Sequence, residues 1–79
     1  MSQLEVYNQI FMDVFELESH ELNSECTVKN IDTWTSISHI DLISAIEDAF
    51  DIMFDTDDII DFSSYESGKS ILTRYGIQL

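Results

Sequence analysis

The chain has 79 residues, 44% of them hydrophobic and 11% aromatic, which predicts one small domain with its own core rather than a disordered tail. Asp and Glu number 16 against 3 Lys and Arg, so the formal net charge is -13. So few cations cannot form a basic stripe, which argues against binding to a nucleic-acid backbone or an anionic membrane surface and favours partners rich in Lys and Arg.

The first helix is expected from about Gln3 to Phe15 or Leu17. Ser2 followed by Glu5 fits a capping box, in which each side chain accepts a hydrogen bond from the other residue's backbone N–H. The apolar side chains recur at helical spacing, at Leu4, Tyr7, Phe11, Val14 and Phe15.

Residues 18–34 lose that period and form a connection rich in turn and cap formers. Connections of this length without secondary structure are uncommon and tend to be functional. We expect an ordered loop that is held against the helices by Leu22, Val28, Ile31 and Trp34.

The second helix is predicted to begin near Thr35 or Ser36 and to end at about Phe50. Its expected apolar face consists of Ile37, Ile40, Leu42, Ile43, Ile46 and Phe50. Its opposite side carries the carboxylates of Asp41, Glu47, Asp48 and Asp51.

The third helix is expected to be short, residues 57–62, after a cap at Asp55 or Thr56. Its inward side chains are predicted to be Ile59, Ile60 and Phe62.

The fourth helix is expected to begin after Ser63, with Glu66 as the capping-box partner, and to stop at Gly76 after Arg74. The side chains at helical spacing are Tyr65, Gly68, Ile71 or Leu72, and Tyr75. No segment has the period of a strand. The predicted fold class is therefore all-α, a four-helix bundle with a long loop between helices 1 and 2 and a short third helix.

Ser36 stands where the long loop becomes the second helix. A helix N-terminus has unpaired N–H groups and about half a positive charge, so it stabilises an anionic group. If Thr35 is the N-cap, Ser36 is the first helical residue and its hydroxyl is free to carry a phosphate ester. The alternative is that Ser36 merely caps the helix.

The second helix carries three stretches of one pattern, Ser36-Ile37, Ile40-Asp41-Leu42-Ile43 and Ala45-Ile46-Glu47-Asp48-Ala49-Phe50. This pattern resembles the second helix of acyl carrier proteins, which opens with Asp-Ser-Leu and continues through acidic, apolar-striped turns to a Phe. The resemblance extends more loosely over the short third segment and the last helix. It implies that residues 1–79 form a single acyl carrier domain, a four-helix bundle of acyl-carrier type.

The resemblance implies that Ser36 carries a covalent 4'-phosphopantetheine arm, attached by a phosphopantetheinyl transferase. The thiol of the arm would hold acyl or aminoacyl intermediates as thioesters for partner enzymes, so the chain would be a carrier and not an enzyme. Thr35 stands where the family has Asp. Thr can still cap the helix, but it brings no charge beside the hydroxyl, which favours a dedicated transferase and a specialised pathway over bulk fatty-acid synthesis.

The docking residues that the resemblance implies on the second helix are Ile37, Asp41, Glu47 and Asp48. The implied partners are the transferase and acyl-loading, synthase or acyltransferase enzymes with basic surfaces. From the residues alone, the same carboxylates suit a solvated helix face equally well. The chain is expected to be a monomer.

Two other function classes stay open. The first is an acidic helical interaction or decoy protein, in which Ser36 is unmodified. The second is a small hydrolase that uses Ser36 with His39 three residues on, but the sequence shows neither an oxyanion hole nor a carboxylate to orient the base.

The sequence shows no metal-binding motif, no pair of cysteines and no targeting signal. His20, Cys26 and His39 lack the spacing of metal ligands, so no metal is expected, and a lone Cys26 cannot form an internal disulfide. No stretch approaches about 18 apolar residues, and the opening MSQLEVYNQ has no basic start of a signal peptide. We therefore expect a cytoplasmic protein without membrane insertion.

Overall fold

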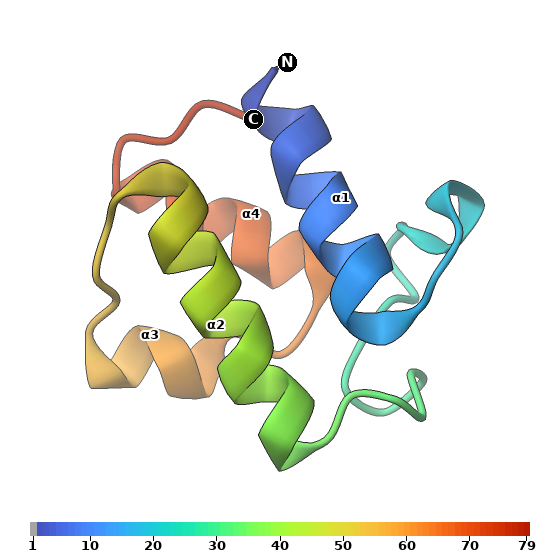
Figure 1. The fold of residues 1–79 in the computed structure, drawn as a ribbon. Helices are drawn as coiled ribbons and strands as arrows, with labels where there is room; N and C mark the ends of the chain where they lie inside the picture. The colour runs from blue at the N-terminus through green and yellow to red at the C-terminus, as the bar shows by residue number, and fades with distance from the viewer. Residues whose placement is uncertain (1) are drawn as a thin grey trace.

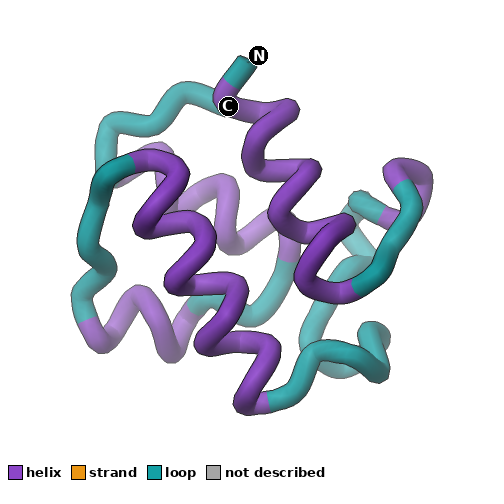
Figure 2. Tube along the Cα trace, in the orientation of Figure 1, coloured by secondary structure: helices purple, strands orange, loops and turns teal. Residues whose placement is uncertain are grey.

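The computed structural model describes residues 2–79 and is built from helices joined by loops (Figure 1). The elements in chain order are α1 (Gln3–Phe15), a 3₁₀ turn η1 (Ser19–Glu21), α2 (Ser36–Phe50), α3 (Thr56–Asp61) and α4 (Tyr65–Arg74). Residues 2–79 contain no strand, and Figure 2 shows only helix and loop. The all-helical fold with four helices, a long first loop and a short third helix is thus confirmed.

The helices enclose one core. α1 and α2 lie side by side and run in opposite directions, with α4 behind them and α3 across one end (Figure 1). The chain ends come together, where the Gln78 N–H donates to Oε1 of Gln3 at 2.9 Å. The radius of gyration is 11.3 Å, close to the value of about 12 Å expected for a folded chain of this length. Within residues 2–79, no helix combines the length and the apolar character needed to cross a bilayer.

Aromatic side chains fill the centre of the core. Phe11 of α1 is buried, and its ring centroid lies within 6.2 Å of five other rings. These rings belong to Tyr7, Phe15, Trp34, Phe62 and Tyr65. α1 therefore joins the loop, α4 and the segment after α3 through a single side chain.

The helix ends follow the local cap signals in most places. The predicted capping box of α1 is present, with the Glu5 N–H donating to Oγ of Ser2 at 3.1 Å. α4 begins one residue later than predicted, because Ser64 is the N-cap and Ser67, not Glu66, completes the box. The backbone explains this shift: the Ser63 carbonyl accepts the N–H of Val28 in the loop, so Ser63 belongs to that contact and not to the cap.

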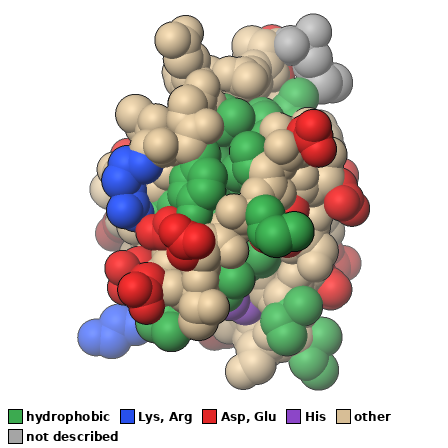
Figure 3. Space-filling view, turned by 90° about the vertical axis from the view of Figure 1, so that its left-hand side faces the viewer, with side chains coloured by type: hydrophobic (Ala, Val, Ile, Leu, Met, Phe, Trp, Pro, Cys, Tyr) green, Lys and Arg blue, Asp and Glu red, His purple; other side chains and the backbone are tan. Residues whose placement is uncertain are grey.

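Three isoleucines predicted to point inward are instead exposed. Ile37 and Ile40 of α2 keep 77% and 64% of their surface, and Ile60 of α3 keeps 71%. At about 100° per residue, Ile37 lies roughly opposite the buried face of α2. A helix that packs against the core on one side leaves the other side, and hence Ile37, in solvent. Figure 3 shows hydrophobic side chains reaching the surface of one face, with carboxylates on either side of them. The buried face of α2 consists of Leu42, Ile43 and Ile46.

The long loop packs against the helices through Leu22, Ile31 and Trp34, but the predicted anchor Val28 is wrong. Val28 is 44% exposed, and its N–H donates to the Ser63 carbonyl at 3.0 Å. Cys26 takes its place in the core at 1% exposure, and its carbonyl accepts the Tyr65 N–H at 2.9 Å. Burial, with Glu21 nearby, raises the pKa of the Cys26 thiol to about 11.

Candidate functional site

Ser36 is the first residue of α2 and is exposed. Thr35 is the N-cap, as one of the two predicted arrangements has it, and its Oγ1 accepts the Ser38 N–H at 3.3 Å. The Ser38 hydroxyl is engaged, because it donates to the Thr33 carbonyl at 2.6 Å and accepts the Thr35 N–H at 2.7 Å. Among residues 2–79 the Ser36 hydroxyl makes no hydrogen bond. Of the three hydroxyls at this helix start, Ser36 alone is uncommitted.

The start of α2 favours an anion at Ser36. The first turn of α2 contains no acidic residue, although the chain as a whole carries a large excess of carboxylates. The helix dipole and the unpaired N–H groups of that turn are therefore not neutralised by the helix's own side chains. A phosphate ester on the Ser36 hydroxyl would lie at the positive end of the helix.

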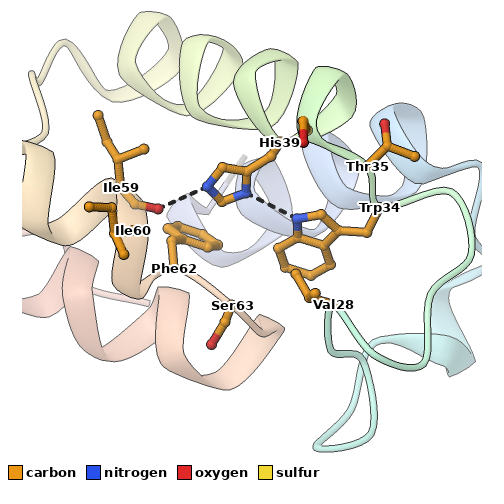
Figure 4. A pocket seen from close by; sticks show the side chains of 9 residues that line it. Val28, Trp34, Thr35, His39, Ile59, Ile60, Phe62 and Ser63 are labelled. Carbon is orange, nitrogen blue, oxygen red and sulfur yellow. Dashed lines mark hydrogen bonds between the residues drawn. The ribbon is translucent and has the colours of Figure 1, made fainter.

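A mainly apolar pocket of about 700 Å³ opens beside Ser36 (Figure 4). Its walls come from the loop, from the start of α2, and from α3 with the segment after it. The lining residues are Val28, Trp34, Thr35, Ser36, His39, Ile59, Ile60, Phe62 and Ser63. Sequence analysis missed this pocket, because it assigned Ile59, Ile60 and Phe62 to the core and Val28 to a loop anchor. The residue spacing carries no signal that places these segments side by side.

His39 crosses the pocket between two other elements. Its Nδ1 accepts the Trp34 indole N–H at 3.0 Å, and its Nε2 lies 2.8 Å from the Ile59 carbonyl oxygen. The indole can only donate and the carbonyl can only accept, so Nδ1 is unprotonated and Nε2 carries the proton. Figure 4 shows both bonds. With both nitrogens used, His39 has no free acceptor to activate the Ser36 hydroxyl, which argues against the hydrolase alternative.

The implied docking residues divide into two groups. Ile37, Asp41 and Asp48 are exposed, and their positions fall within about 40° of one another around the α2 axis. Glu47 is half-buried, and its carboxylate accepts the Phe54 N–H at 2.9 Å, so it holds the turn after α2. The structure thus brings three of the four residues onto one exposed face and gives the fourth a structural contact.

The structure brings together one group of possible metal ligands that the sequence pattern did not indicate. Ligand atoms of Glu18, His20 and Glu21 lie within 4.8 Å of one another around η1. Glu21 already accepts the Glu18 N–H at 2.9 Å, and Glu18 and His20 are exposed. Clusters of exposed acids are common on proteins without a metal, and we assign no metal to this one.

Comparisons of the chain with protein-family models, curated proteins and solved structures found no match. The resemblance to acyl carrier proteins therefore stays a prediction, and its support comes from the residues of this site.

Proposed function

We propose that the chain is an acyl carrier protein that holds acyl or aminoacyl intermediates as thioesters on a 4'-phosphopantetheine arm at Ser36. The observation that carries the proposal is the exposed and uncommitted Ser36 hydroxyl at the N-terminus of α2. The order of elements, with a long loop before α2 and a short α3, is compatible with a bundle of acyl-carrier type.

The chemistry at Ser36 is a transfer of phosphopantetheine from coenzyme A. The Ser36 oxygen attacks the phosphorus next to the pantetheine, loses its proton, and releases adenosine 3',5'-bisphosphate. The new phosphodiester keeps one negative charge beside the start of α2, where the helix N–H groups favour it. A transferase supplies the catalytic groups for this step, and the chain supplies the acceptor.

The arm gives the chain its function by tethering. A cargo held on a flexible arm meets each docked enzyme at a high local concentration, so bimolecular encounters become local ones. The pocket beside Ser36 has apolar walls that would shelter the cargo between encounters. Thr35 in place of the Asp expected from the resemblance favours a specialised pathway, such as secondary-metabolite synthesis, polysaccharide decoration or aminoacyl transfer.

Intact-mass measurement tests the proposal. The purified chain is incubated with coenzyme A and phosphopantetheinyl transferases of both broad and dedicated specificity. We expect the wild-type chain to gain the mass of one arm and Ser36→Ala to gain nothing. Ser44→Ala is the matched control, because Ser44 is also exposed on α2 and its hydroxyl makes no hydrogen bond among residues 2–79, and it should gain one arm. An unmodified wild type, or a gain that survives in Ser36→Ala, contradicts the proposal.

The second candidate is an acidic interaction or decoy protein that needs no prosthetic group. It is favoured by the net charge of -13 and by exposed Ile37 and Ile40 on an acidic helix, which suit a partner with basic and apolar side chains. Under this alternative the wild-type mass stays unchanged while a basic partner still binds, so the same measurement separates the two.

A further inference from the structure

We propose that His39 is a pH-sensitive latch on the pocket beside Ser36, which holds Trp34 in place when neutral and releases it when protonated while keeping its bond to α3. The inference goes beyond the proposed carrier function, because it concerns the pocket wall and holds whether or not Ser36 carries an arm.

The two bonds of His39 respond differently to a proton. In the neutral ring, Nδ1 accepts from Trp34 and Nε2–H donates to Ile59. Protonation places a hydrogen on Nδ1, so Nδ1 and the Trp34 indole then present two donors to each other and that bond is lost. Nε2–H still donates to the Ile59 carbonyl. The latch therefore opens on the loop side only.

Trp34 is a residue whose release changes the pocket. It is 6% exposed, stacks on Phe15 at 4.6 Å between ring centroids, and forms a wall of the pocket. Its indole N–H has one hydrogen-bond acceptor among residues 2–79, Nδ1 of His39. A buried donor without a partner is unfavourable, so loss of this bond favours movement of the indole toward water. The loop wall of the pocket then opens, while Ile59 and α3 remain attached to α2.

The other charged groups near His39 do not enter the pocket. His39 is the only titratable side chain among the lining residues. The exposed charged groups of the elements around it lie outside the pocket lining: Glu5 and Asp13 on α1 and Glu16 at its C-cap, Glu18, Glu25, Lys29 and Asp32 in the loop, Asp41 and Asp48 on α2, and Asp57 and Asp61 on α3. The remaining acid of α3, Asp58, is turned away toward Arg74 and Tyr75. Protonation inside the pocket thus acts on one ring, and histidine is the side chain that changes charge near neutral pH.

Nuclear magnetic resonance of the unmodified chain tests the latch. Trp34 is the only tryptophan, so its indole N–H gives a single signal. Between about pH 8 and about pH 5, we expect this signal to shift and its exchange with solvent, corrected for intrinsic pH dependence, to rise on the order of tenfold. The helical circular dichroism should stay constant. Binding of the neutral fluorophore N-phenyl-1-naphthylamine should strengthen several-fold over the same range.

The two histidines provide a matched pair of variants. His20→Gln removes an exposed ring that lies beside Glu18 at η1 and outside the pocket lining, and it should keep the wild-type titration of the Trp34 signal. His39→Gln replaces the ring by an amide that does not titrate, and both the titration and the change in fluorophore binding should disappear. The latch is overturned if the Trp34 signal does not titrate in the wild type, or if the titration persists in His39→Gln.

A ring measurement keeps the inference falsifiable if His39→Gln does not fold. Nitrogen-15 shifts of the wild-type imidazole at about pH 8 should show hydrogen on Nε2 of His39 and none on Nδ1. Hydrogen on Nδ1 at that pH would overturn the latch. All of these measurements use the chain without phosphopantetheine. Failure of the latch and failure of the carrier proposal are therefore seen in separate experiments.

Discussion

At the scale of single residues, Gly68 shows how closely α4 approaches α1. A Cβ at this position would overlap the Tyr7 hydroxyl and the Phe62 ring. The same hydroxyl donates to the Tyr65 carbonyl at 2.7 Å inside the core. Burial of Tyr7, with Tyr65 nearby, raises the pKa of its phenol far above the ordinary range, so Tyr7 stays a neutral donor. Gly68 is thus required for a contact that sequence spacing alone does not reveal.

Gly68→Ala is expected to destabilise the fold although alanine favours helices. Overpacking costs about 1–3 kcal/mol, which exceeds the gain of about 0.5–1 kcal/mol from replacing glycine in a helix. The midpoint of urea unfolding should therefore fall. Ser70→Ala is the control, because Ser70 is exposed on the same helix and its substitution should leave the midpoint unchanged or slightly higher. Equal midpoints for Gly68→Ala and the wild type would mean that Tyr7 and Phe62 can move aside freely.

The three hydroxyls at the start of α2 show what residue types leave undecided. Thr35, Ser36 and Ser38 can all cap a helix. The structure uses Thr35 and Ser38 in a reciprocal capping box and leaves Ser36 free. The choice depends on the backbone at Thr33, whose carbonyl accepts from Ser38, and hence on how the loop enters the helix.

At the scale of elements, α3 is too short to be stable alone and depends on its contacts with α4. The buried carboxylate of Asp58 accepts from Arg74 at 2.7 Å and from the Tyr75 hydroxyl at 2.6 Å. The Tyr75 oxygen in turn accepts the Asp55 N–H at 2.9 Å, at the start of α3. These bonds attach Asp55 and Asp58 of the α3 segment to the end of α4. They therefore hold α3, which forms one wall of the pocket, in place.

The Asp58 contact predicts a specific pH dependence of stability. The Tyr75 hydroxyl, followed by Arg74, lowers the pKa of the Asp58 carboxyl below its ordinary range. The unfolded chain therefore binds this proton more readily, so the contact stabilises the fold above about pH 4 and is lost as the pH falls through the lowered value. Asp58→Asn should be less stable than the wild type at neutral pH, and the difference should shrink in acid. Urea unfolding at several pH values measures it.

Asp57→Asn is the matched control for Asp58→Asn. Asp57 lies next to Asp58 in the first turn of α3, but it is exposed and makes no side-chain hydrogen bond among residues 2–79. Its substitution should not reproduce the pH-dependent difference. A constant difference between Asp58→Asn and the wild type across the acid range would contradict the assigned role of the carboxylate.

The exposed face of α2 gives a prediction that rests on the proposed carrier function. Asp41→Lys reverses one charge beside Ile37 without touching a buried group. Modification by the transferase at low salt should slow several-fold, and the difference should fade at high salt, because exposed charges chiefly affect the encounter rate. Glu66→Lys makes the same charge change at an exposed position of α4 and should have a smaller effect. Equal rates for Asp41→Lys and the wild type would favour a solvated face.

At the scale of the whole molecule, the net charge of -13 is poorly compensated. The ion pairs within residues 2–79 are Arg74 with Asp58 and, when the ring is protonated, His20 with Glu18. Lys69 lies over the Tyr65 ring at 5.2 Å. Most carboxylates therefore repel one another in a small volume, which destabilises the compact state.

The charge balance predicts that salt stabilises the fold. The melting temperature should rise between low salt and about 0.5 M sodium chloride, where the screening length is only a few ångströms. Millimolar magnesium should act in the same direction. Mild acid should also stabilise the fold, because it reduces the repulsion between carboxylates. Acid weakens the Asp58 contact at the same time, so the Asp58→Asn variant, which lacks that contact, shows the relief of repulsion by itself. A melting temperature that does not change with salt concentration would show that the carboxylates are far enough apart to be solvated independently.

The local pattern of residues was enough to predict the ends of the four helices to within about one residue. Helical periodicity, the Ser2 cap and the stop at Gly76 act within one or two turns, so they can be seen in the sequence. Gly76 has a φ of 83°, and the hydrogen bonds around it close α4 as the sequence predicted. The excess of acid also follows from composition.

The assembled fold was needed to decide which apolar side chains are buried and which polar ones are free. Ile37, Ile40 and Ile60 look like core residues until the neighbours of α2 and α3 are in place, because burial depends on what covers a face and not on the residue itself. His39 meets the Ile59 carbonyl 20 positions along the chain. Contacts of this range form only when the helices pack, so the pocket beside Ser36 is a property of the assembled structure.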